Sequence, residues 1–255
     1  MKKIAVLLFL AVILAACGSN TPQPVKPAET SPAPTQTISL PGSLTIVSVS
    51  LKTSGKSPDY SVTTDIPVLQ GNYPHRAEFD REVSDFVQQE TNAFKKNLAD
   101  WTPVPDMPGS SFILTFTSLP YNNRFASLQF KEEYYLAGAA HPSHQIISLV
   151  YDLEKGQDVT LEQLFLPNSN YLQVISDYCK TELGKRDIAF DAQQHGADPT
   201  KENYAVWNIS TDGLVITFNE YQVVAYAAGP QTVVVPYAAL KGIIDPQGPL
   251  ADAAK

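Results

Sequence analysis

Apolar and polar positions alternate where the folded part of the chain begins. Residues 44–51 alternate weakly and predict a β-strand, and residues 60–69 predict its hairpin partner. Proline lacks the N–H that a strand donates to its neighbour, so Pro67 marks an edge strand or lies near a strand's end. The folded body is therefore expected to open with a β-hairpin.

The next segment has helical periodicity. Apolar residues recur at spacings of three, four and seven, while charged and amide side chains occupy the other face. This pattern predicts an amphipathic helix of about 25 residues that begins near Pro74 and stops at Pro103. We expect its apolar stripe to be core, formed by Phe79, Val83, Phe86, Val87, Phe94, Leu98 and Trp101.

The rest of the body alternates strands with one further long helix. That helix is predicted over 171–183, capped by Asn168 or Asn170 and ended by Gly184. Hairpin turns dominate and no Gly-rich phosphate loop follows a strand. The sequence therefore predicts an α+β fold of antiparallel sheets packed with two main helices. The expected strands cover 112–119, 125–136, 144–153, 204–209, 214–218 and 232–236, with a short helix over 238–244.

The 255 residues are 44% hydrophobic and 10% aromatic, which suits a folded body with a buried core. Their net charge is −8, and phosphate binding needs a basic face. Nucleic acid is therefore not an expected partner, and no cofactor is indicated.

The first seventeen residues predict where the protein is located. Lys2 and Lys3 precede an unbroken apolar run over 4–16, too short for a membrane-spanning helix but typical of a signal peptide. The run ends in Leu14-Ala-Ala-Cys17, which resembles the bacterial lipobox. We expect residues 1–16 to be a lipoprotein signal peptide and Cys17 to carry the acyl chains. An anchored protein would face away from the cytoplasm at the cell envelope.

The remaining chain divides by composition. Residues 17–41 comprise Cys17 and a Pro-rich linker, which is too polar to fold and is stiffened by proline. Two α+β halves are expected over 42–145 and 146–245, followed by a flexible Pro/Gly/Ala tail over 246–255. Cleavage after residue 16 would change the net charge from −8 to −10, because the removed segment carries two lysines and no acid.

No catalytic or metal-binding motif is recognisable, so we expect no enzymatic activity and no metal. His141 and His144 are the only close histidine pair, and an i, i+3 spacing on a strand would point them to opposite faces. Glu132 and Glu133 are expected to lie on a strand, with one of the two acidic side chains exposed. Cys179 lies in the apolar pattern of a helix and is expected to be a buried, unreactive thiol.

Two segments rich in small residues are candidates for a ligand-binding patch. One is the break 137–142, which contains His141, and the other is 225–230. Aromatic side chains beside small residues suit recognition, but ordinary packing that anchors the loops explains the same pattern. The candidate ligand-binding residues are His141, Tyr221, Tyr226 and Gly229.

Several motifs, in their order and spacing, resemble the RsiV/PdaC-like extracytoplasmic domain family. These motifs are GAAHP at 138–142, YDLEKG at 151–156, VTLEQLF at 159–165, TDGLVITF at 211–218, EYQVVAYAAG at 220–229 and VVVPYAAL at 233–240. The family includes ectodomains of lysozyme-sensing anti-sigma factors and a domain of a peptidoglycan deacetylase. The resemblance implies an α+β fold, with a PdaC-like half over 42–145 and an RsiV-like half over 146–245.

The resemblance, the linker and the acidic charge favour an anchored binding module. Its expected partner is a cell-wall component such as peptidoglycan, or a wall-lytic protein such as lysozyme, which a negative surface would attract. One alternative is an enzyme that modifies envelope glycans, with His141 and a nearby carboxylate as the general base. The other is a structural envelope lipoprotein.

Overall fold

The computed structural model describes residues 44–102, 104, 107–191 and 195–253. The predicted signal peptide (1–16), the lipidation residue Cys17 and the linker (17–41) lie outside the described residues. Within these ranges no helix combines the length and apolar character needed to cross a bilayer.

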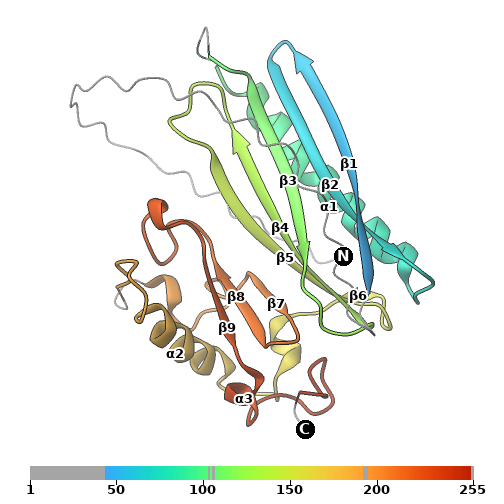
Figure 1. Cartoon of the computed structure of the whole chain (residues 1–255), viewed down its shortest axis with the longest axis vertical. Coiled ribbons are helices and arrows are strands. Elements are labelled where there is room, and N and C mark those ends of the chain that lie inside the picture. The colour runs from blue at the N-terminus through green and yellow to red at the C-terminus, as the bar shows by residue number, and fades with distance from the viewer. Residues whose placement is uncertain (1–43, 103, 105–106, 192–194, 254–255) are drawn as a thin grey trace. The chain divides into compact units, whose positions relative to one another are not determined.

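Six strands form the first sheet in their chain order (Figure 1). Neighbours are antiparallel except β2 and β3, which run parallel because helix α1 (Arg76–Ala99) connects them as a crossover. The α+β prediction is confirmed, with this parallel pair as the one difference. The strands are β1 (Thr45–Lys56), β2 (Asp59–Gln70), β3 (Ser110–Ser118), β4 (Phe125–Tyr135), β5 (Ser143–Asp152) and β6 (Gln157–Asp158).

Helix α1 covers one face of this sheet with its apolar stripe, as its periodicity predicts (Figure 1). Phe94 stacks on Phe112 of β3, with ring centroids 5.5 Å apart. Trp101 departs from the prediction, because it lies after the helix, is 37% exposed and donates from its indole nitrogen to the Ala137 carbonyl. The stripe residues that are buried are Phe79, Val83, Val87, Phe94 and Leu98.

A second, three-stranded antiparallel sheet packs against helix α2 (Tyr171–Leu183), which matches its predicted bounds. Cys179 of α2 is fully buried, and burial raises the pKa of its thiol to about 12. The remaining elements are β7 (Trp207–Ile209), β8 (Leu214–Phe218), β9 (Gln231–Val235), α3 (Tyr237–Leu240) and the 3-10 turns η1 (Leu161–Leu164), η2 (His195–Ala197) and η3 (Tyr226–Ala228).

Two boundaries expected from composition differ in the structure. The division at residue 145 falls inside β5, because this strand pairs with β4 along most of its length. The tail over 246–255 is not a flexible appendage through residue 253, since Leu250 is fully buried in the core shared by α2 and the second sheet. One apolar side chain among Pro, Gly and Ala is enough to fix this segment against the fold.

A row of hydrogen bonds joins the outer face of β4–β5 to the second sheet, and we call it the inter-sheet seam. The Asn208 amide of β7 donates to the Leu128 carbonyl at 2.8 Å. Gln129 donates to the Thr217 hydroxyl at 3.0 Å, and the Trp207 N–H donates to Ser148 Oγ. At the far end Asn219 bonds both the N–H and the carbonyl of Ile146, at 2.7 and 3.0 Å.

Two carboxyl groups meet in the apolar layer between α1 and the first sheet. Glu90 of α1 is 7% exposed and Glu132 of β4 is 5% exposed. Burial, together with the neighbouring Glu90 carboxyl, raises the pKa of Glu132 to about 8. Burial also raises the pKa of Glu90. The pair is therefore held at least partly protonated, since two adjacent buried carboxylates repel each other.

This pair predicts a pH-dependent stability. The unfolded Glu132 ionises near 4.5, so its contribution is fully present below that pH and is lost as the pH rises through about 8. Glu132→Gln stays neutral and should be more stable than the parent by about 1–3 kcal/mol at about pH 9. Urea unfolding from about pH 5 to 9 measures the effect. Asp85→Asn on the exposed face of α1 is the control, and equal pH slopes for parent and Glu132→Gln would contradict the prediction.

Candidate functional site

Three aromatic side chains from segments about eighty residues apart in sequence lie together near the end of the inter-sheet seam, with His141 and Tyr221 exposed and Tyr226 half-buried. The rings of His141 and Tyr226 are 4.3 Å apart between centroids. Tyr221 continues the row, with its ring centroid 5.5 Å from that of Tyr226. We call His141, Tyr221 and Tyr226 the aromatic platform. It contains three of the four predicted ligand-binding residues.

The segment that carries His141 is fixed by hydrogen bonds from neighbouring elements. The Ala137 N–H donates to Ser110 Oγ of β3, and its carbonyl accepts from Trp101. The Tyr226 hydroxyl donates to the Pro142 carbonyl at 3.0 Å, and His141 Nδ1 lies 2.8 Å from the same oxygen. One carbonyl thus joins the two halves of the platform.

The fourth predicted residue, Gly229, ends the turn η3 that carries Tyr226. It has a positive φ of 66°, which a glycine adopts without strain. Its carbonyl accepts from the Gln231 side chain at 3.3 Å. Gly229 thus shapes the platform loop, three residues away from the stacked rings.

The expectation that His141 and His144 face apart was wrong. Pro142 takes His141 out of the strand, since β5 begins at Ser143, and both imidazoles approach Tyr226. The His144 ring centroid lies 6.3 Å from that of Tyr226. The strand rule fails here because it applies only to residues that share one extended segment.

Two carboxylates flank His144, and the sequence alone did not reveal them. Glu133 of β4 pairs in register with His144 and brings Oε2 to 3.2 Å from Nε2. Glu220, just after β8, brings Oε1 to 2.8 Å from Nδ1. Hairpin register could have suggested the Glu133 contact. Only the fold of the second sheet brings Glu220 to His144.

In this arrangement each imidazole nitrogen of His144 faces a carboxylate. The carboxylates lie on opposite sides of the ring and do not converge as metal ligands do. Across the described residues, no group of three or more acidic, histidine or cysteine side chains is arranged to hold a metal ion.

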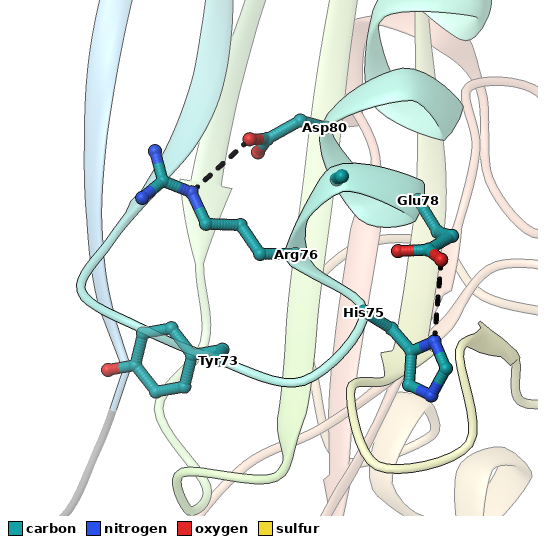
Figure 2. Close-up of a pocket in the computed structure, with 6 residues that line it drawn as sticks. Tyr73, His75, Arg76, Glu78 and Asp80 are labelled. Carbon is teal, nitrogen blue, oxygen red and sulfur yellow. Dashed lines mark hydrogen bonds and ion pairs between the residues drawn. The ribbon is translucent and has the colours of Figure 1, made fainter.

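A hollow of about 440 Å³, open to solvent, lies at the start of α1 (Figure 2). Arg76 Nε lies 3.3 Å from Asp80, and His75 Nδ1 lies 3.6 Å from Glu78. Its charged groups therefore pair with one another along one helical turn. The aromatic platform draws on three separate segments and is the better candidate site.

Comparison with known proteins places part of the site in a defined family. Residues 162–238, which include Glu220, Tyr221 and Tyr226, match the family model described as a protein of unknown function, DUF3298. A solved DUF3298 family member from Bacteroides fragilis has the same fold, with a TM-score of 0.61 at 13% identity over 84% of this chain and 98% of that one.

Two curated relatives carry names of enzymes. The Bacillus subtilis peptidoglycan-N-acetylmuramic acid deacetylase PdaC is 26% identical over 202 residues, or 77% of this chain and 41% of that protein. A Mycobacterium tuberculosis protein named as an esterase is 26% identical over 190 residues, or 72% of this chain and 78% of that protein. The resemblance to the RsiV/PdaC-like family is thereby confirmed.

These names overturn one expectation. A definite statement that the chain is not an enzyme conflicts with relatives named as a deacetylase and an esterase. The expectation rested on the absence of recognisable sequence motifs. Sequence motifs miss a site whose groups come from distant segments of the chain.

The backbone conformation of Tyr221 allows a prediction about the stability of the platform loop. It is 65% exposed and has a positive φ of 64°, which costs a residue with a side chain about 1 kcal/mol. The free energy of unfolding of Tyr221→Gly should therefore exceed that of Tyr221→Ala by about 1 kcal/mol, because only glycine adopts this positive φ without strain. Chemical denaturation of both variants measures this difference, and equal stabilities would refute the assignment of strain.

Proposed function

We propose that this protein binds glycan strands of the bacterial cell envelope on its aromatic platform. The observation that carries the proposal is the row of His141, Tyr226 and Tyr221, whose two outer members are exposed. Pyranose rings present apolar C–H faces that stack on aromatic side chains, while their polar substituents need hydrogen-bond partners. Glu133 and Glu220 supply acceptors beside the rings.

The proposed location supports this function. The lipobox-like sequence ending at Cys17 predicts an acylated protein on the outer face of a membrane, and the Pro-rich linker would hold the body away from the lipid. The relative named as a peptidoglycan deacetylase acts on a cell-wall polymer by its name. A glycan ligand would therefore be within reach of the anchored platform.

The charge of the chain favours a second candidate, a cationic wall-lytic protein such as lysozyme. The proposed mature form carries a net charge of −10, and an acidic surface attracts a basic partner at low ionic strength. Because such attraction is screened by salt, the binding of lysozyme should weaken strongly between about 50 and 300 mM salt. Stacked glycan should be affected less.

Loss of one platform ring tests the glycan proposal. Tyr226→Ala should lower the affinity for soluble peptidoglycan fragments at least about tenfold, because Tyr226 contacts both neighbouring rings of the row. Calorimetric titration measures the affinity. Tyr73→Ala, in the hollow at the start of α1, is the matched control. Unchanged binding by Tyr226→Ala, or an equal loss in both variants, would contradict the proposed site.

The anchor has its own test. Cys17→Ser removes the only sulfur that the lipobox-like sequence offers for acylation, so the variant should lose incorporation of labelled palmitate and leave the membrane fraction. Cys179→Ser, at a buried thiol, should keep the label. Label retained by Cys17→Ser would overturn the proposed anchor.

A further inference from the structure

We propose that the platform recognises amino sugars whose 2-amino group is free and charged, rather than N-acetylated. This inference rests on the proposed glycan function and names the chemistry of the ligand. The ammonium would lie beside the exposed carboxylate of Glu133, while the sugar ring lies against the aromatic platform.

The carboxylates leave negative charge at the site without a matching cation. Among the described residues, His144 is the only ion-pair partner of Glu133 or Glu220. Two carboxylates around one imidazole give a negative cluster whether the imidazole is neutral or protonated. The Glu133 side chain is 37% exposed, so it is accessible to a ligand group.

The field of these carboxylates reaches the platform rings. Burial raises the pKa of the Tyr226 hydroxyl, and the charges of Glu220 and Glu133 raise it further. A negative potential at this ring adds to the attraction that an aromatic face already has for a cation. Rings and carboxylates thus favour the same kind of substituent.

Acetylation would remove the charged ammonium, which is attracted both to the aromatic rings and to the carboxylates. An N-acetyl amide carries no charge, so it leaves the carboxylates uncompensated and adds bulk at the position where the ammonium would lie. Hydrogen bonds between charged partners are shorter and about twice as strong as neutral ones. The site should therefore discriminate by charge, and the discrimination should depend on Glu133.

The test compares two probes of equal length, the β-1,4-linked tetrasaccharides of glucosamine and of N-acetylglucosamine. Calorimetry on the full chain is done at about pH 6, below the ordinary pKa of an amino group, and at low salt. We expect the glucosamine probe to bind at least about tenfold more tightly. Glu133→Gln should reduce this preference at least about threefold, and Glu220→Gln provides a second variant. Glu78→Gln, beside His75 in the hollow at the start of α1, should keep the full preference for the glucosamine probe.

The outcomes separate the two proposals. Equal affinity for both probes, lost in Tyr226→Ala, would overturn the free-amine preference and leave glycan binding intact. Absence of binding to either probe and to peptidoglycan fragments would overturn the proposed function itself. A tetralysine peptide that binds as tightly as the glucosamine probe would show that charge alone is recognised, which overturns the specificity for amino sugars.

Discussion

A seam of hydrogen bonds between two sheets is the constraint on which the candidate site depends. Asn208 bonds the Leu128 carbonyl with its side chain fully buried, and Asn219 bonds both backbone groups of Ile146. A buried donor such as the Asn208 amide needs such a partner, because leaving it unpaired costs about 1–3 kcal/mol. The seam therefore fixes one register of the second sheet on β4–β5. That register brings Glu220 to His144 and Tyr226 to His141.

The site lies across the boundary of the region that matches the family model. The matched region, 162–238, supplies Glu220 and the two tyrosines, while His141, His144 and Glu133 come from β4, β5 and the segment between them. Neither set alone contains the stacked pair of His141 and Tyr226 or both carboxylates. Recognition at this site therefore requires the two sheets to be joined. The positive φ of Tyr221 suits this view, since strained backbone at an exposed aromatic residue is typical of functional positions.

Much of the fold could be predicted from the sequence because its signals are local. The stripe of α1, the bounds of α2 and most strands follow from the periodicity of apolar residues. The parallel pairing of β2 with β3 and the burial of Leu250 depend on distant contacts and did not follow. At the site, His141, Tyr221 and Tyr226 stood out as aromatic residues beside small ones. Glu133 and Glu220 did not, because a carboxylate acquires its role only from what the fold places beside it.

The central claim is that the seam assembles a platform on which a sugar ring stacks. The most direct measurement is the intermolecular nuclear Overhauser effect spectrum of the protein with bound glucosamine tetrasaccharide. The account predicts cross-peaks from the C–H protons of a sugar ring to the rings of both His141 and Tyr226, which come from the two sides of the seam. Cross-peaks to Tyr73 at the start of α1, or to only one side of the platform, would contradict it.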